Sequence, residues 1–476
     1  MLIFEKTKKG RKCVDIKKPE VEKYNFDSSF LRENDANLPE VAEIDLVRHY
    51  SNYAGEAKGV DNVFYPLGSC TMKYNPKLNE EVASLKGFNA IHPLQDEVDV
   101  QGALEVMYTL SERLKEITGM DAVSLQPFAG AQGEYSALKL IEAYHKENSK
   151  TPRTKIIVPD SAHGTNPASA RLAGYEVVHV KSNSEYGVDL DELKKVVGDD
   201  TAALMLTNPT TLGLFEKNIK KIAKIVHDVG GLLYYDGANL NPIMGVVRPG
   251  DMGFDVVHLN LHKTFSTPHG GGGPGSGPIG CKELLSKYLP NPKVVKVGNE
   301  YFFNSYESSI GKVGSFYGNF LVCLRALAYI ETLGSDGIPQ SAKLAVLNAN
   351  YLKHNLETKY KAINSKSKYC MHEFVLSLED LKKETGVSGM DVAKCLIDKN
   401  IHPPTMYFPL IVQEALMFEP TETESKETLD YAINSMLEIY ELAHSNPEYC
   451  HDAPHNAIIK RPDETTAARN PILKHI

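Results

Sequence analysis

The chain lacks the features that mark secreted, membrane-bound or nucleic-acid-binding proteins. Its seven cysteines are scattered and never form a CxxC pair, which favours reduced thiols in a cytosolic enzyme and indicates neither a disulfide framework nor a zinc site. No apolar run approaches the roughly 20 residues that span a bilayer. A net charge of −9 gives no basis for binding nucleic acid or an acidic membrane surface. The opening MLIFEKTKKGRK resembles neither a secretory signal nor a transit peptide, so we expect a cytoplasmic protein. We expect no bound metal.

The length and composition are those of a soluble globular protein with more than one domain. The 476 residues are 42% hydrophobic and 24% charged, which is enough for two or three cores. Residues 1–100 show little periodicity and many turn formers, so we predict an extended N-terminal arm and a segment at the entrance of a site. We predict a large domain over residues 101–335 and a smaller C-terminal α+β domain with a tail over residues 336–476.

Strands alternate with helices through the predicted large domain. Short apolar runs of strand length are separated by segments with helical spacing, and they lie at residues 122–125, 155–158, 175–180, 202–206, 232–235 and 256–259. This rhythm predicts the α/β class, with a mostly parallel sheet covered by helices on both sides. Every candidate functional residue described below comes just after one of these strands, where ligands of open α/β sheets bind.

An acid and a lysine at the ends of two neighbouring strands point to pyridoxal phosphate. Asp236 ends the run at 232–235, and Lys263 follows the run at 256–259. A carboxylate can keep the pyridine nitrogen of that cofactor protonated, and a lysine amine can form the Schiff base. Taken singly, Asp236 could be a turn residue and Lys263 a solvated loop charge. Together, between two strands, they favour a cofactor site.

Further residues could complete such a site. Gly130, Ala131 and Gln132 lie in a small-residue loop between a strand and a helix, a natural seat for a phosphate. His163 could stack on a pyridine ring or be an ordinary loop histidine, and Asn208 could reach the cofactor or simply build an Asn-Pro turn. A glycine run at residues 270–273 follows Lys263.

Four longer motifs make the resemblance to one family specific. They are YPLGSCTMKYNP at residues 65–76, PFAGAQGEY at 127–135, AHGTNPA at 162–168 and HLNLHKTF at 258–265. They resemble the glycine dehydrogenase (decarboxylating) or P-protein family of the glycine cleavage system, and the match extends from about residue 60 to near Pro471. In that family the enzyme is one chain of two related halves or two separate subunits. This chain resembles the lysine-bearing second half, which implies a subunit 2 that works with a homologous subunit 1, as α2β2.

The resemblance implies the fold and a role for each candidate residue. The fold would be that of the PLP-dependent transferases of fold type I. Lys263 would form the Schiff base, Asp236 would pair with the pyridine nitrogen, and His163 and Ala238 would cover the two ring faces. The other residues would lie around the cofactor, with Gly130, Ala131 and Gln132 at the phosphate and Asn208 and His262 close by. The resemblance also implies that residues 64–76 and the glycine run at 270–273 border the entrance of the site.

The activity implied is the decarboxylation of glycine, with transfer of the aminomethyl group to the lipoyl group of H-protein and release of CO2. Another enzyme of the same architecture, such as an aminotransferase or a cysteine desulfurase, is the first alternative. A non-catalytic assembly subunit is the second, although it fits better a chain without Lys263. The residue that binds the substrate carboxylate is open, with Arg461 a candidate because arginine binds carboxylates bidentately.

Overall fold

The computed structural model describes residues 2–269, 275–363 and 368–473. Its contacts divide the chain into two units, Met1–Gly59 and Val60–Ile476. The first unit contains η1 (Ile3–Lys6), η2 (Ser28–Phe30) and the helix α1 (Glu43–Glu56), joined by chain that is mostly neither helix nor strand. No helix in the described ranges combines the length and apolar composition needed to cross a membrane.

A seven-stranded sheet forms the centre of the second unit, in the order β1-β7-β6-β5-β4-β2-β3. The pairs β3–β2, β2–β4, β4–β5 and β5–β6 are parallel, whereas β7 runs antiparallel to both β6 and β1. The predicted mostly parallel sheet is therefore confirmed. The strands are β1 (Ala122–Ser124), β2 (Lys155–Pro159), β3 (Glu176–Val180), β4 (Thr201–Thr207), β5 (Leu232–Gly237), β6 (Val256–Leu259) and β7 (Ile279–Cys281).

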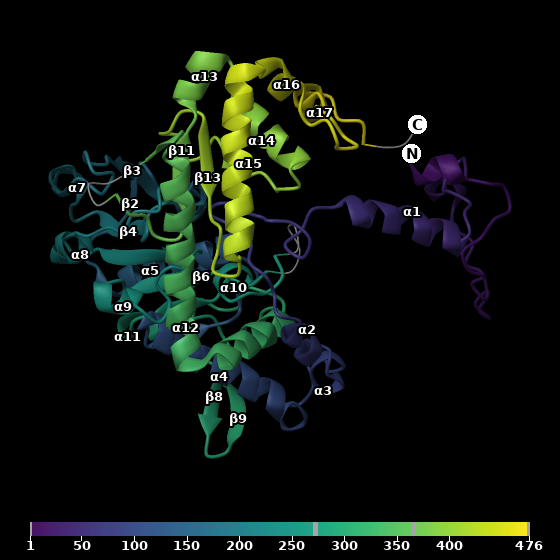
Figure 1. The fold of residues 1–476 in the computed structure, drawn as a ribbon. Helices are drawn as coiled ribbons and strands as arrows, with labels where there is room; N and C mark the ends of the chain where they lie inside the picture. Colours follow the sequence, from purple (N-terminus) through teal and green to yellow (C-terminus); the bar gives the residue numbers. More distant parts are fainter. Residues whose placement is uncertain (1, 270–274, 364–367, 474–476) are drawn as a thin grey trace. The chain divides into compact units, whose positions relative to one another are not determined.

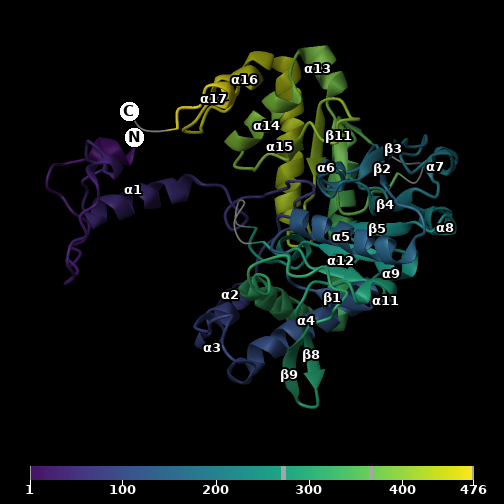
Figure 2. The same ribbon diagram turned by 180° about the vertical axis from the view of Figure 1, so that it is seen from behind.

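Helices cover both faces of this sheet, because both faces of its central strands are apolar. Along β4, Leu204 and Leu206 pack into one core, while Ala203 and Met205 pack into another. Such double burial is what continuous apolar strands predict. Figures 1 and 2 show the sheet from its two sides. The connecting helices are α5 (Gly130–Asn148), α6 (Thr165–Leu172), α7 (Leu190–Val196), α8 (Ile219–Asp228), α9 (Pro249–Met252), α10 (Leu261–Thr264) and α11 (Glu283–Ser286).

The segments before and after the sheet pack against one of its faces. Leu110 and Leu114 of α4 share a core with Cys323 and Leu327 of α12 (Phe320–Leu356). Helix α12 is interrupted at Gly334, whose φ of 63° and ψ of −169° are not helical. The remaining elements here are α2 (Lys77–Ala83), α3 (Lys86–Asn89), η3 (Glu97–Asp99), α4 (Gln101–Thr118) and the hairpin of β8 (Lys293–Val297) and β9 (Glu300–Asn304).

A smaller antiparallel sheet follows α12, in the order β10-β11-β13-β12. Its strands are β10 (Lys361–Ala362), β11 (Phe374–Ser377), β12 (Thr405–Met406) and β13 (Ala415–Phe418). Helix α12 packs beside α15 and shares a core with this sheet (Figure 1). The helices are α13 (Glu379–Thr385), α14 (Gly389–Asp398), α15 (Lys426–Ser445), α16 (Pro447–Asp452) and α17 (Glu464–Arg469). The predicted domain boundary at residue 335 falls within α12, next to the interruption at Gly334. The division stays a prediction.

Candidate active site

A cavity of about 260 Å³ lies at the carboxyl ends of the central strands of the large sheet. The parallel strands β2, β4, β5 and β6 all point their last residues to this edge. The predicted residues that line it are Gly130, Ala131, His163, Asp236, Ala238, His262 and Lys263. Residues far apart in the sequence are thus brought together at one site.

Lys263 lies in α10, the single helical turn that follows β6. Its Nζ donates a hydrogen bond of 2.8 Å to the backbone carbonyl of Ser69. Ser69 belongs to residues 68–73, which we call the 68–73 loop, and which comes from a different part of the chain. The amine is therefore directed into the cavity by a backbone acceptor that no local pattern around Lys263 indicates.

Asp236, near the end of β5, is a buried carboxylate held by several donors. Its oxygens accept hydrogen bonds from Asn166 Nδ2 at 2.8 Å and from the Ala238 amide at 3.0 Å, and His258 Nε2 lies 3.5 Å away. Burial by itself would raise the pKa of Asp236, but the His258 ring and these hydrogen bonds hold the pKa below its ordinary value. Asp236 is therefore an anion at neutral pH, although it is 3% exposed.

His258 is oriented by Tyr234 on its far side, where the phenol and Nδ1 are hydrogen-bonded. Burial raises the pKa of Tyr234 well above its ordinary value, so the phenol keeps its proton. Burial also lowers the pKa of His258, so the ring is neutral. Because the Asp236 carboxylate can only accept, the Nε2 that faces it carries the ring proton, and Nδ1 accepts from the Tyr234 phenol.

His163 follows β2 and is held by a local contact. Its Nδ1 is 2.9 Å from Thr165 Oγ1, and its ring meets the Phe408 ring edge-on with centroids 5.4 Å apart. Burial lowers the pKa of His163, so its ring is neutral at neutral pH. A neutral, half-buried imidazole on the cavity wall suits stacking on an aromatic ring.

The N-terminus of α5 forms another wall of the cavity. The helix begins at Gly130, so the first amides of the helix are directed out of its end, as an anion requires. A Cβ at Gly130 would lie 2.4 Å from Asn260 Oδ1, so a larger residue would displace the Asn260 side chain from the cavity wall. The glycine run at residues 270–273, predicted near the entrance, lies outside the described residues.

Two predicted residues, Gln132 and Asn208, lie differently from expectation. The side chain of Gln132 bonds to backbone groups, the amide of Phe128 at 2.6 Å and the carbonyl of Val313. Asn208 is fully buried behind the wall and accepts a hydrogen bond from the Glu216 amide at 2.9 Å. Neither side chain is among the described residues that line the cavity. Because Gln132 lies in the first turn of α5, its contribution to binding a ligand would come from its backbone amide.

His262 and Arg461 also have partners of their own. His262 Nδ1 accepts a hydrogen bond of 3.2 Å from the Ser276 amide, and burial lowers its pKa to about 4. Arg461 forms an ion pair of 2.9 Å with Asp391 and is not among the described residues of the cavity wall. The suggestion that Arg461 binds a substrate carboxylate therefore has no geometric basis.

Sequence reasoning missed a group of acidic and imidazole side chains beside Lys263. His372 and Glu373 line the cavity, and the ligand-type atoms of His372, Glu373 and Glu419 lie within 4.8 Å of one another. Glu373 Oε2 accepts a hydrogen bond of 2.8 Å from the Ser69 amide. The sequence carries no local signal for these contacts, because residues 69 and 373 are 304 positions apart.

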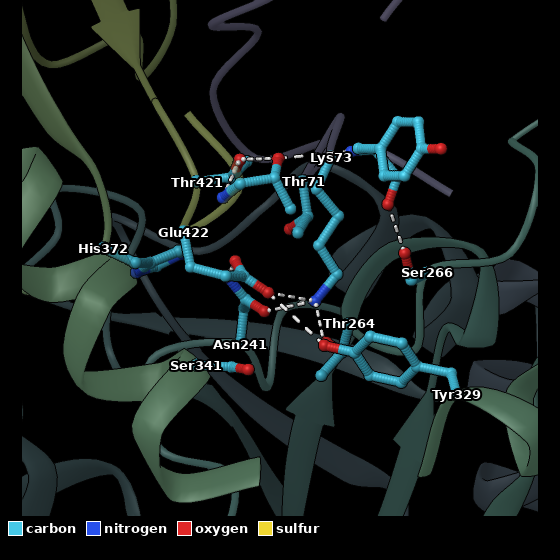
Figure 3. Close-up of polar contacts among 12 residues, drawn as sticks. Thr71, Lys73, Asn241, Thr264, Ser266, Tyr329, Ser341, His372, Thr421 and Glu422 are labelled. Carbon is cyan, nitrogen blue, oxygen red and sulfur yellow. Dashed lines mark hydrogen bonds and ion pairs between the residues drawn. The ribbon is translucent and has the colours of Figure 1, made fainter. Parts of the chain in front are cut away.

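The 68–73 loop belongs to the segment predicted at the entrance of the site, for which the sequence indicates no single role. Ser69 and Thr71 have φ of 65° and 47°, a left-handed conformation that costs a non-glycine residue about 1–3 kcal/mol. Lys73 holds the end of the loop. Its buried Nζ donates to Glu422 Oε1 at 2.7 Å, Asn241 Oδ1 at 2.9 Å and Tyr329 OH at 3.0 Å (Figure 3).

The residues of the cavity fit pyridoxal phosphate. A buried carboxylate, a helix N-terminus suited to a phosphate and a lysine amine border the same space. Thr207 Oγ1 and Asn260 Oδ1 are buried at the wall without a hydrogen-bond partner in the part of the chain that the structure describes. Buried polar atoms normally have a partner, so a polar ligand would satisfy them.

Comparison with protein families and curated proteins gives full-length matches. Residues 25–300 match the family described as glycine cleavage system P-protein, and residues 341–463 match the glycine dehydrogenase C-terminal domain. The chain is 62% identical over 475 residues to the probable glycine dehydrogenase (decarboxylating) subunit 2 of Treponema denticola, covering 100% of this chain and 98% of that protein. It is 58% identical to the protein of the same name from Staphylococcus haemolyticus, covering 99% and 96%.

Solved structures agree on the fold. A glycine decarboxylase (P-protein) of the glycine cleavage system, in an inhibitor-bound form, superposes with a TM-score of 0.72 at 19% identity, over 86% of this chain and 92% of that one. A cysteine desulfurase from Escherichia coli gives a TM-score of 0.62 at 15% identity, over 82% and 98%. The fold expected from the sequence, that of the PLP-dependent transferases of fold type I, is confirmed.

Proposed function

Because this chain belongs to the glycine cleavage system P-protein family, we propose that it decarboxylates glycine and transfers the aminomethyl group to the lipoyl group of H-protein. The observation that carries the proposal is that Lys263 and Asp236 border one cavity, at the ends of neighbouring parallel strands. An aminotransferase or a cysteine desulfurase would need the same two residues. Membership of the family is what favours glycine decarboxylation over these alternatives.

The cofactor of this reaction is pyridoxal phosphate, which supplies an electron sink for the bond that breaks. Lys263 would bind it covalently, and Asp236 would hold a proton on the pyridine nitrogen. His163 and Ala238 would lie against its two faces, and Gly130, Ala131 and the Gln132 backbone would hold its phosphate. Asn208 would act from behind the wall, through the segment it positions, while His262 would lie beside Lys263.

The side chains around Asp236 keep it ready for this role. Two hydrogen-bond donors and the neutral His258 fix both carboxylate oxygens, so the anion needs little reorganisation when a positive charge develops beside it. Burial excludes water, which strengthens the attraction between the carboxylate and a protonated ring nitrogen. Asp236 is therefore suited to hold a proton on an adjacent nitrogen, and it is not itself a proton donor.

The partners of the reaction are part of the same proposal. The relatives are named subunit 2, so we propose that a homologous subunit 1 completes the enzyme, as a heterotetramer in the cytoplasm. The lipoylated H-protein would bring its disulfide to the cavity. Glycine would be the small-molecule substrate.

One experiment separates the proposed reaction from the alternatives. The chain, purified with its copurifying subunit and loaded with pyridoxal phosphate, is given glycine labelled in the carboxyl carbon. We expect labelled CO2 only when lipoylated H-protein is present, and none with the carrier lacking its lipoyl group. Transfer of the amino group to a keto acid without release of CO2 would instead identify an aminotransferase.

A further inference from the structure

The wall of the cavity beside Lys263 carries a pair of acids that the proposed steps do not use. Glu373 directly precedes β11, and Glu419 directly follows β13. These strands are antiparallel with Phe374 opposite Phe418, so the two carboxyl groups lie side by side. Both are deeply buried, with Glu373 3% and Glu419 0% exposed. Two like charges this close and this deeply buried cannot both remain ionised.

The hydrogen bonds decide which of the two acids holds a proton. Glu419 accepts from the Thr71 amide at 3.0 Å, from Thr71 Oγ1 at 2.6 Å and from Asn239 Nδ2 at 3.0 and 3.1 Å. Glu373 accepts one hydrogen bond, from the Ser69 amide. Burial and the neighbouring Glu419 raise the pKa of Glu373 well above its ordinary value. Burial raises the pKa of Glu419 as well, but its hydrogen bonds from Thr71 and Asn239 oppose that rise. Glu419, which accepts more hydrogen bonds, is therefore the carboxylate, and Glu373 is the neutral acid.

Glu373 lines the same cavity as Lys263, the lysine proposed to bind the cofactor. Ser69 joins the two groups, because its carbonyl accepts from Lys263 Nζ while its amide donates to Glu373 Oε2, both at 2.8 Å. Glu134 is the other acid on the wall with a raised pKa, about 7 through burial and Asp236. It lies beside Asp236, however, and its two oxygens already accept from Thr165 and Ser169.

We propose that Glu373 is a further catalytic residue, the acid that protonates the sulfur released when the disulfide is split; this rests on the proposed function. When CO2 leaves, the electron pair of the broken C–C bond forms the new bond from the aminomethyl carbon to one sulfur. The S–S bond breaks, and the second sulfur leaves with its electron pair and takes the proton of Glu373. The ammonium group of the next glycine gives up a proton before its nitrogen reacts, and this proton restores Glu373. The proton ends on sulfur, so no outside acid is consumed.

Five titratable groups around Glu373 set the pH at which it works. Glu419, the Lys263 amine and the Cys70 thiol come from other segments. The Cys370 thiol and the His372 ring, whose Nε2 is 3.8 Å from Glu373 Oε1, belong to the segment that leads into β11. Burial lowers the pKa of His372 to about 3, so that ring is neutral throughout the working range. Because Glu373 acts in its protonated form, the rate of transfer falls as the pH rises through its pKa.

The test compares Glu373→Gln with Glu379→Gln, an exposed acid paired with Lys383 on the neighbouring helix α13. Glutamine keeps the acceptor for the Ser69 amide and removes the proton. The assay is release of CO2 from glycine with lipoylated H-protein, measured over a pH range on the complex loaded with pyridoxal phosphate. We expect Glu373→Gln to slow transfer by about 100-fold or more and to abolish the fall in rate at high pH, with glycine still changing the cofactor spectrum at an unchanged midpoint. Glu379→Gln should match the wild type.

A conservative variant gives a second, independent result. Glu373→Asp keeps an acid on a shorter side chain, so it should recover part of the rate and move the high-pH fall. The proposal is overturned if Glu373→Gln retains the wild-type pH profile, whatever its rate, or if Glu373→Asp leaves the high-pH fall where it was. A wild-type complex that releases no CO2 would instead refute the proposed function itself.

Discussion

Replacing Lys73 by methionine should destabilise the protein far more than any exposed lysine change. The side chain of Lys73 is 1% exposed and that of its ion-pair partner Glu422 is 7% exposed. Burial alone would lower the pKa of Lys73, but Glu422 and Tyr329 more than offset this and raise it, so the ammonium remains charged. All three of its N–H donors have acceptors, from the segment after β5, from α12 and from the segment after β13 (Figure 3).

The magnitude follows from what the substitution leaves behind. Methionine fills most of the space, but Glu422 loses its cation and keeps only the hydrogen bonds that it accepts from Asn241 Nδ2 at 3.1 Å and Tyr329 OH at 3.4 Å. Removing one partner of a buried ion pair costs about 3–5 kcal/mol. The matched control is Lys77→Met, four residues on, whose ion pair with Asp61 is 60% exposed on both sides and contributes about 0–1 kcal/mol.

The assay is urea denaturation of the two variants and the wild type, which gives the apparent free energy of unfolding. The double variant Lys73→Met/Glu422→Leu should recover most of the loss, because it removes both charges. A loss for Lys73→Met within about 1 kcal/mol of that for Lys77→Met would refute the reasoning. So would a double variant no more stable than Lys73→Met.

Three further results are expected. Asp236→Asn should retain pyridoxal phosphate but slow decarboxylation, because a preorganised charge worth roughly 3–4 kcal/mol is lost; near-normal turnover would contradict its role. Gly130→Ala should weaken cofactor binding, measured by titration of the cofactor absorbance, because the new Cβ would meet Asn260 at 2.4 Å; unchanged affinity would exclude this helix end as the phosphate site. Since the pKa of His372 is about 3 in the folded protein and about 6.5 in the unfolded chain, the unfolded state alone binds that proton between these values. Stability should fall by up to about 1.4 kcal/mol per pH unit as the pH drops from 6.5 towards 3, and His372→Asn should make urea-unfolding curves less pH-dependent there than the exposed control His354→Asn.

The sequence predicts the parts of the site that depend on local pattern. Asp236 and Lys263 could be found because each follows a short apolar run, and parallel strands bring their carboxyl ends to one edge. Gly130 could be found because a small-residue loop opens a helix. In each case the functional residue lies within a few positions of the element that places it.

The parts that escaped prediction depend on contacts between distant segments. Ser69 meets Glu373, and Thr71 meets Glu419 across 348 positions, only after the 68–73 loop packs beside the smaller sheet. Lys73 has the sequence context of a loop lysine, and nothing local shows that it is buried. Gln132 lies in the first turn of a helix that the sequence predicts, but its side chain bonds to backbone groups that periodicity does not reveal.

The central claim is that Lys263 binds pyridoxal phosphate, and it can be tested directly. The protein loaded with the cofactor is reduced with borohydride, digested, and analysed by mass spectrometry for the lysine that carries the phosphopyridoxyl group. The label is predicted on Lys263, with Lys263→Ala losing both the label and the yellow absorbance. A label on Lys73 or any other lysine, or full labelling of Lys263→Ala, would contradict the account.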